Sequence, residues 1–338
     1  MDARSHLLSV APMMDWTDRH CRYFLRGFSP RALLYTEMVT AEALLRGDAA
    51  RLLRFDPEEQ PVALQLGGSE PGRLAAAARL GEAAGYAEIN LNCGCPSDRV
   101  KAGAFGACLM LTPARVADCV AAMRAAVRVP VTVKMRIGVL EAGAGAPWRA
   151  RLAQFDQHDY EQLHGFTAAL RAAGCNLFIV HARQAVLGGL SPKDNRAVPP
   201  LRYEVARRLP GDFPDCRFVL NGGMRDVAGV QAALPGFAGV MLGREAYHRP
   251  QVLAELHAVL FADAWSMPEE GALIERMAAY AARERARGEP LAAITRHMLG
   301  LYSGRPGARA FRHALASAAR QPGAGPELIR AAVAAASA

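Results

Sequence analysis

Eight short apolar runs, separated by segments of helical character, constrain the fold of this chain more than any other feature. The intervening segments, such as Pro71–Ala84, Pro113–Val127 and Tyr160–Ala173, are rich in Ala, Leu, Arg and Glu at helical spacing. Strands that alternate with helices pair in parallel through right-handed crossovers. The pattern predicts an α/β fold, a (β/α)8 TIM barrel. The eight predicted strands are Leu7–Pro12, Leu33–Val39, Val62–Leu66, Ala87–Cys93, Val131–Ile137, Leu177–Ala182, Phe218–Asn221 and Gly239–Gly243.

A doubly wound open sheet is the alternative architecture. It is less favoured because no G-x-G-x-x-G motif follows any of the runs. From about Pro268 the alternation stops, and consecutive helical segments separated by Gly and Pro follow. The sequence therefore predicts a barrel over residues 1–262 and a C-terminal all-helical domain over 263–338. The predicted helical segments of that domain are Glu269–Arg287, Pro290–Tyr302, Pro306–Arg320 and Pro326–Ala336.

Composition restricts the class of protein. The 338 residues are 51% hydrophobic and 21% charged, which is typical of a globular chain. No run of about 18 uncharged apolar residues is present, and the N-terminus lacks the apolar segment of a signal peptide. The seven cysteines are irregularly spaced without a C-x-x-C pair, which argues against a disulfide framework or a zinc site. We therefore expect a cytoplasmic protein with reduced thiols, no metal and no membrane partner.

Positive charge is concentrated near the C-terminus. The chain carries a net charge of +8, and the segment from Arg276 onward has ten arginines against three glutamates, a surplus of seven. Such asymmetry fits a polyanionic partner, either nucleic acid or a membrane surface. A solvated, arginine-rich helical surface explains it equally well.

Polar residues end most of the predicted strands, and strand ends carry the active site in a barrel of this type. The stretch Glu88–Ser97 ends in a thiol, Cys95, between Gly94 and Pro96. Each polar residue also has a purely structural interpretation. Cys95 could be a small buried hydrophobe, Lys134 could pair with Glu88, His181 could be a core histidine, and Gly222-Gly223 could be a simple turn. Their convergence on one face of the barrel favours a functional site.

The last two predicted strand ends suggest a phosphate site. Glycines there let backbone N–H groups approach a phosphate, and Arg244 adds a cation. Lys134 and His181 would then face the electron-rich end of a cofactor and stabilise negative charge. Flavin mononucleotide (FMN) fits this pattern, because it has one phosphate and a planar ring system and needs no dinucleotide motif.

Extended motifs in this chain resemble the tRNA-dihydrouridine synthases, and in particular their A subfamily. The resemblance runs from Ser9 to about Leu315. The motifs that carry it are APMMDWTDRHCRYFLR, LLYTEMVT, PVALQLGGSEP, EINLNCGCPSDRVKAGAFGACLM, VPVTVKMRIG, HARQAVLGGLSPKDNR, NGG, GVMLGREAY and RHMLGLYSGRPGARAFR.

The resemblance implies an enzyme that reduces the C5=C6 bond of D-loop uridines in tRNA, at positions 20 and 20a, with FMN and with NADPH as reductant. Hydride would pass from flavin N5 to C6 of uracil, and Cys95 would donate the proton to C5. It implies FMN ligands at Pro12, Met13, Met14, Gln65, Lys134, His181, Asn221, Gly222, Gly223, Gly243 and Arg244. It implies tRNA contacts at Asn92, Lys193, Arg196, Arg309 and Arg312, of which the last two lie three residues apart and so share a helix face. We expect the protein to be monomeric.

Three positions depart from the family pattern. Cys93 replaces a common valine, and we expect it to pack as a small apolar side chain. The segment Leu140–Asp159 is longer than usual and predicts an irregular surface loop. Gly188 stands where relatives often have serine or lysine. Two other functions remain open, a tRNA-binding protein or chaperone that keeps the flavin fold, and a flavin oxidoreductase acting on free pyrimidines.

Overall fold

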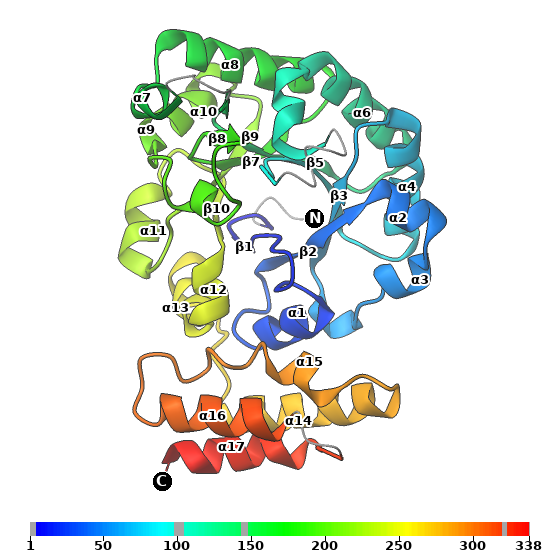
Figure 1. Ribbon diagram of the computed structural model, residues 1–338, viewed down its shortest axis with the longest axis vertical. Helices are drawn as coiled ribbons and strands as arrows, with labels where there is room; N and C mark the ends of the chain where they lie inside the picture. The colour runs from blue at the N-terminus through cyan, green and yellow to red at the C-terminus, as the bar shows by residue number, and fades with distance from the viewer. Residues whose placement is uncertain (1–4, 98–104, 143–147, 320–322, 338) are drawn as a thin grey trace.

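The core of the molecule is a closed barrel of eight parallel strands in the order β1-β10-β9-β7-β5-β4-β3-β2. The computed structural model describes residues 5–97, 105–142, 148–319 and 323–337. Figure 1 shows the strands at the centre of a ring of helices. Closure confirms the TIM barrel and excludes the open sheet. The barrel strands are β1 (Leu8–Val10), β2 (Leu33–Thr40), β3 (Val62–Gly67), β4 (Glu88–Cys93), β5 (Val131–Arg136), β7 (Leu177–His181), β9 (Arg217–Asn221) and β10 (Gly239–Leu242).

Helices follow the strands around the outside of the barrel. Local caps begin several of them: Asp18 accepts a hydrogen bond from the Cys21 N–H at the start of α1, and Asp156 forms a capping box with Asp159 at the start of α8. The main helices of the ring are α1 (Arg19–Arg26), α2 (Ala41–Arg46), α3 (Ala49–Leu52), α4 (Pro71–Ala83), α6 (Pro113–Ala126), α8 (Gln157–Ala172), α9 (Tyr203–Ala206), α10 (Arg208–Asp212), α11 (Val227–Ala233), α12 (Arg244–His248) and α13 (Gln251–Leu260).

Side chains alternate between the two faces of each barrel strand. On β5, Val131, Val133 and Met135 point outward into the main hydrophobic core beneath the helices. The intervening residues point into the barrel, where an apolar layer contains Tyr35 and Ile179. Inward-facing residues nearer the carboxyl ends of the strands are polar, and this end of the barrel is its mouth.

A second, two-stranded parallel sheet lies outside the barrel and was not predicted. It pairs β6 (Val139–Glu141) with β8 (Ala185–Leu187). The expectation of an irregular loop over Leu140–Asp159 is therefore wrong for much of the segment, since it begins in β6, contains α7 (Trp148–Ala153) and ends in the first turn of α8. The cause is tertiary pairing: three residues gain backbone partners from a distant segment that sequence periodicity does not reveal. Residues 143–147 of the segment lie outside the described residues.

The C-terminal region is helical, as predicted, and packs against one side of the barrel (Figure 1). It contains α14 (Glu270–Ala286), α15 (Leu291–Thr295), α16 (Ala308–Ala318) and α17 (Glu327–Ser337). The predicted helix Pro290–Tyr302 is too long, because α15 ends at Thr295 and turns follow to Tyr302. Within the turns that follow, Gly300 packs closely against the end of α12: a Cβ there would lie 2.7 Å from the His248 carbonyl oxygen. Within the described ranges, no helix is long and apolar enough to cross a membrane.

Candidate active site at the barrel mouth

Strand register brings the predicted site residues of the barrel together. Asn92 lies beside Lys134, Arg136 beside His181, and His181 beside Asn221 on neighbouring strands. All of these side chains belong to the inward-facing set of their strands. The mouth therefore carries an amide, an ammonium, a guanidinium and an imidazole in adjacent positions, as the strand-end pattern predicted.

Lys134 is a partly buried cation that has no counter-ion among the residues described. No hydrogen bond or ion pair from any residue that the structure describes reaches its Nζ. Burial, helped by the nearby Arg136 charge, lowers its pKa from 10.5 to about 7. The alternative pairing with Glu88 is wrong, because Glu88 is bound by Tyr35, Thr132 and His6 deeper in the barrel.

His181 and the Gly222-Gly223 turn form the neighbouring wall. Burial and the charges of Arg136 and Lys134 hold the pKa of His181 well below its usual value, so the ring is neutral at pH 7. Gly222 has φ +113° and Gly223 has φ +75°, a left-handed region that glycine tolerates. A Cβ on Gly222 would lie 2.6 Å from His181 Cδ2, so the backbone and the ring approach each other as closely as glycine allows. Tyr203 supports the turn by donating a hydrogen bond to the Gly222 carbonyl oxygen.

The end of β1 has a strained turn. Asp15 adopts φ 65°, and its N–H donates to the Glu37 carboxylate at 2.5 Å. The Met13 N–H donates to Thr17 Oγ1 at 2.9 Å, and the Met14 side chain is 55% exposed. A strained backbone conformation of this kind persists only where surrounding interactions, here the hydrogen bonds of Asp15 and Met13, hold it in place. The predicted flavin ligands Met13 and Met14 therefore occupy a rigid turn at the mouth.

Cys95 lies just beyond β4 and is partly exposed. Its N–H and that of Gly94 both donate to Asn92 Oδ1, at 3.0 and 3.1 Å. Its Sγ lies 3.7 Å from Ser97 Oγ. Cys93, two residues earlier, is buried in the outer core, and burial raises the pKa of its thiol well above the usual value. The expectation that Cys93 packs as an apolar side chain is confirmed. The rest of the predicted motif, residues 98–104, lies outside the described residues.

Arg136 is a site residue to which the sequence assigned no role. Its buried guanidinium donates to three backbone carbonyl oxygens, those of Gly94, Gln184 and Asn195, at 2.9 to 3.0 Å. One side chain thus ties the Cys95 loop to two segments of the loop that follows β7. One feature of the sequence could have identified Arg136 as a site residue: it lies two residues after Lys134 and therefore on the same face of the strand.

Exposed cations border the mouth. Lys193, Arg196 and Arg244 are all exposed, and Arg244 Nη2 donates to the Arg196 carbonyl oxygen at 3.3 Å. This contact joins the loop after β7 to the loop after β10, so two predicted tRNA-contact residues adjoin a predicted phosphate ligand. Asn92, the other tRNA-contact residue predicted in the barrel, is only 7% exposed and has both ends of its amide engaged within the protein.

Most arginines of the C-terminal region are engaged in internal contacts. Those with acidic or carbonyl partners are Arg276, Arg283, Arg285, Arg287, Arg296, Arg305 and Arg330. Arg309 and Arg312 differ, since both are exposed on α16 and neither has an ion pair with a described residue. Arg320 lies outside the described residues. The basic surplus is therefore smaller at the surface than in the sequence, and it is concentrated on the two predicted tRNA contacts.

A family model for dihydrouridine synthase (Dus) matches residues 9–337. The chain belongs to the dihydrouridine synthase family. Relatives in this family named tRNA-dihydrouridine(20/20a) synthase include one from Pseudomonas aeruginosa, 54% identical over 93% of this chain and 90% of its own length. Another, from Xanthomonas campestris, is 52% identical over 97% of this chain and 92% of its own length. A third, from Synechocystis, is 48% identical over 98% and 95% of the two chains.

A solved structure supports the fold of this dihydrouridine synthase family member. It is a 2-naphthoyl-CoA reductase in complex with 2-naphthoyl-CoA, matched with a TM-score of 0.51 at 12% identity. The match covers 75% of this chain and 50% of that chain. At this identity the similarity concerns the barrel architecture and not the reaction.

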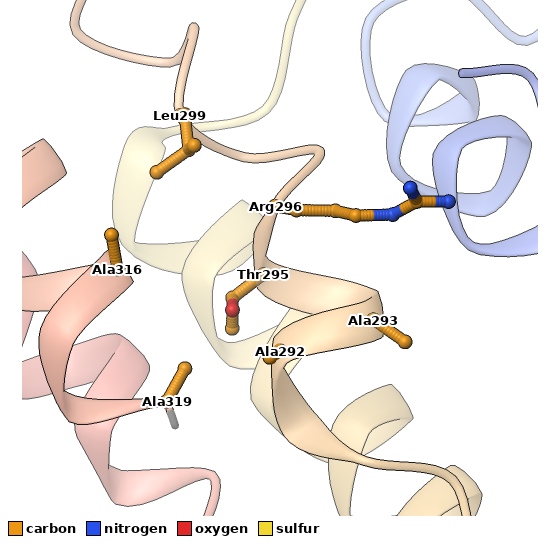
Figure 2. A pocket seen from close by; sticks show the side chains of 7 residues that line it. All are labelled: Ala292, Ala293, Thr295, Arg296, Leu299, Ala316 and Ala319. Carbon is orange, nitrogen blue, oxygen red and sulfur yellow. The ribbon is translucent and has the colours of Figure 1, made fainter. Parts of the chain in front are cut away.

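A cavity of about 370 Å³ lies away from the mouth, between α15 and α16. Figure 2 shows its lining of small side chains, with Arg296 extending toward the neighbouring barrel helix. The Arg296 guanidinium is bound to Asp18 at 2.6 Å, so it serves the contact between α15 and the barrel. None of the lining residues is a predicted ligand of flavin or tRNA.

Proposed function

We propose that this protein reduces the C5=C6 bond of uridine in the D-loop of tRNA to 5,6-dihydrouridine. The observation that carries the proposal is a partly exposed thiol, Cys95, held at the mouth of a dihydrouridine synthase family barrel beside Lys134. Positions 20 and 20a are the proposed targets, because the relatives that match nearly the whole chain bear that specificity in their names. The proposed architecture is a catalytic barrel over residues 1–262 and a tRNA-binding helical domain over 263–338.

The residues of the mouth fit FMN, reduced by NADPH, as the cofactor. Lys134 offers a cation that has no counter-ion among the described residues, and the absence of a Cβ at Gly222 lets the backbone of the turn lie directly against His181. The other proposed ligands are Pro12, Met13, Met14, Gln65, His181, Asn221, Gly243 and Arg244. Bound flavin would supply the hydride that uridine C6 receives.

The residues of the chain have separable roles in this reaction. Cys95 holds a proton on Sγ and delivers it to C5, which requires a thiol that is protonated when the base arrives. Lys134 and neutral His181 place donors where negative charge develops. Asn92, Lys193 and Arg196 would orient the base and its backbone, and Arg309 and Arg312 would bind tRNA phosphates.

The decisive experiment compares two cysteine variants with tRNA that lacks dihydrouridine. Cys95→Ala is expected to keep its flavin and its NADPH oxidation but to lose dihydrouridine formation by at least about 100-fold, the scale of general acid catalysis. Cys108→Ala removes another partly exposed thiol and is the control, expected to remain active. Mass spectrometry of digested tRNA measures the product. Wild-type yield from Cys95→Ala would refute the role of the thiol.

The same assay separates the other two functions. A protein that binds tRNA but forms no dihydrouridine, with flavin and NADPH present, would be a binding protein or chaperone. Reduction of free uridine as efficient as that of tRNA would indicate a pyrimidine oxidoreductase. The proposal expects product only in tRNA.

A further inference from the structure

A buried acidic residue at the floor of the barrel has no part in the reaction described above. Glu88 begins β4 and is fully buried. Its Oε1 accepts hydrogen bonds from the hydroxyls of Tyr35 and Thr132, both at 2.6 Å. Its Oε2 lies 2.5 Å from His6 Nε2. Buried carboxylates are costly unless they are this well bonded, so the group needs an explanation.

A continuous series of side-chain hydrogen bonds runs from Glu88 toward the mouth. Thr132 Oγ1, which donates to Glu88, accepts from Asn90 Nδ2 at 2.8 Å. Asn90 Oδ1 in turn accepts from Gln65 Nε2 at 2.8 Å. All of these residues are 0 to 1% exposed. Water therefore does not compete for any of these bonds.

The series continues to the catalytic loop. Gln65 Oε1 accepts from Asn92 Nδ2 at 2.8 Å, and Asn92 Oδ1 accepts the N–H groups of Gly94 and Cys95. Gln65 is a proposed flavin ligand and Asn92 a proposed tRNA contact. The barrel floor is thus joined to the flavin site, the tRNA site and the Cys95 backbone by bonds between side chains.

The two ends of the series impose the same direction on the bonds between them, because the Glu88 carboxylate can only accept and the Gly94 and Cys95 N–H groups can only donate. A carboxylate oxygen can only accept, so the Thr132 hydroxyl must donate to it and must accept from Asn90 through its lone pair. Asn90 then presents its oxygen to Gln65, and Gln65 presents its oxygen to Asn92. An amide side chain alone could take either of two orientations; within this series each has one.

We propose that Glu88 is a positioning residue that acts through Thr132, Asn90, Gln65 and Asn92 to orient the flavin-binding and base-binding amides and to hold the Cys95 backbone. This inference rests on the proposed function, from which the flavin and tRNA roles of Gln65 and Asn92 are taken. The hydrogen bonds themselves are present in the protein without cofactor. Tyr35 is not a link between Glu88 and Asn90, because its hydroxyl donates to Glu88 Oε1.

Thr132 is the member at which the inference is tested most cleanly. Thr132→Val keeps a branched side chain of similar size but removes both the donor to Glu88 and the acceptor for Asn90. Thr132→Ser retains the hydroxyl and should restore the series. Tyr35→Phe removes the other hydroxyl on the same carboxylate oxygen and is the matched control.

The measurement is amide hydrogen exchange at Gly94 and Cys95 in the protein without cofactor, read by NMR. Thr132→Val is expected to raise exchange at these two amides roughly tenfold, the scale of one lost hydrogen bond. Thr132→Ser and Tyr35→Phe are expected to stay within about twofold of wild type at the same amides. Amides of β9, a strand that carries no member of the series, report any general loss of stability. Equal exchange in the Val and Ser variants, or a rise confined to the level seen in β9, would overturn the inference.

Glu88→Gln gives a second test should Thr132→Val fail to fold. The neutral amide has the same shape but is a weaker acceptor than a carboxylate and can face Thr132 with either edge, so the hydrogen bond that ends the series at residue 88 is weakened or lost. Exchange at Gly94 and Cys95 should rise several-fold, and the flavin dissociation constant, measured by quenching of FMN fluorescence, should rise with it. Unchanged exchange in this variant would refute the role of Glu88. Dihydrouridine formation by the wild type is scored separately, so failure of the proposed function and failure of this inference give different results.

Discussion

Lys134, a proposed flavin ligand, carries an electrostatic cost in the protein without cofactor. Its ammonium is partly buried and has no counter-ion among the described residues, and its pKa is lowered to about 7. A lysine with a depressed pKa binds fewer protons in the folded than in the unfolded state between pH 7 and 10.5. Its contribution to the free energy of unfolding therefore rises with pH over that window, and below about pH 7 the folded protein carries the cost of the buried charge.

Lys134→Met is expected to stabilise the protein without cofactor while weakening flavin binding. At pH 7 the free energy of unfolding should rise by roughly 1–2 kcal/mol, since one pKa unit is worth about 1.4 kcal/mol and partial exposure reduces the effect. Urea titrations at pH 6, 7 and 9 measure it, and the gain should shrink at the highest pH. A loss of stability at pH 7, or flavin binding equal to wild type, would contradict this role.

Gly222→Ala is expected to reduce flavin binding by displacing His181. The backbone at φ +113° costs an alanine about 1–3 kcal/mol, and the new Cβ would also collide with the imidazole at 2.6 Å. Gly236→Ala is the control, because Gly236 has φ +86° but no atom within 4 Å of the added Cβ. Both variants should lose stability, and Gly222→Ala alone should lose flavin affinity, by fluorescence titration. Equal affinity in the two would show that His181 is not displaced.

The sequence predicts single site residues where a simple geometric rule applies. The rule that barrel strand ends carry function identified Lys134, His181 and the Cys95 loop, and register then brought the first two to one face. The role of Arg136 was not predicted, because its partners are backbone carbonyl oxygens and the pattern of side chains in a sequence does not reveal such partners. The hydrogen bonds of Glu88 inside the barrel were not predicted for a related reason. They join residues on separate strands, and the register between those strands is not known until the structure is known.

Helix α16 also shows, at the scale of an element, what the sequence predicts and what only the structure reveals. Phe311 and Leu315 are buried on one face, while Arg309 and Arg312 are exposed on another. The arginine surplus pointed to nucleic acid, but it could not separate the arginines that bind neighbouring carboxylates from those that face solvent. That distinction depends on packing between helices, for example of α17 against α14, where Arg330 binds Glu275.

The double variant Arg309→Ala/Arg312→Ala is expected to weaken tRNA binding at least about tenfold and to reduce the slope of log K against log salt by about 2. Filter binding of tRNA across a range of salt concentrations measures both quantities. Arg330→Ala is the control, since it removes an exposed charge of the same region that is already paired. Similar losses in the two proteins would mean that general charge, and not these two positions, governs binding.

Element boundaries were predicted well where local patterns decide them. The eight barrel strands and the helices α4, α6 and α8 lie close to their expected ranges. The helix predicted over Pro290–Tyr302 was too long, since α15 ends at Thr295. The β6–β8 pair was not predicted, because pairing between distant segments creates it. Three-residue strands carry too little alternation to be recognised from sequence.

At the scale of the molecule, the helical region is joined to the barrel by a concentrated ionic contact. Glu284 of α14 is 2% exposed and accepts from Arg19 at 2.8 Å and from Arg54 at 2.7 Å, both from the barrel side, and from Arg287 at 2.7 Å. Burial alone would raise the pKa of Glu284, but these arginines lower it below its usual value. The contribution of Glu284 to the free energy of unfolding is complete above pH 4.5. It is lost as the pH falls through the pKa of Glu284 in the folded protein, which is lower.

Glu284→Gln is expected to loosen the helical region from the barrel. The free energy of unfolding should fall by roughly 1–3 kcal/mol at neutral pH, because three arginines lose a charged acceptor. Glu275→Gln removes an exposed ion pair and should change it by less than about 1 kcal/mol. Urea unfolding, with exchange of α14 amides as a local probe, tests both. A loss of protection from exchange that is confined to barrel amides would contradict the assignment of Glu284 to the contact between the helical region and the barrel.

The Arg136 guanidinium has a consequence for the RNA. Three carbonyl oxygens from separate parts of the rim share this one donor, so Gly94, Gln184 and Asn195 are held as a unit. We therefore expect the rim to resist widening around a nucleotide that is still stacked. The mechanical work of exposing the uridine then falls on the tRNA, at a cost of a few kcal/mol. We therefore expect tRNA transcripts with a weakened fold around the D-loop to react faster than tightly folded ones, and a comparison of initial rates on the two kinds of transcript measures this.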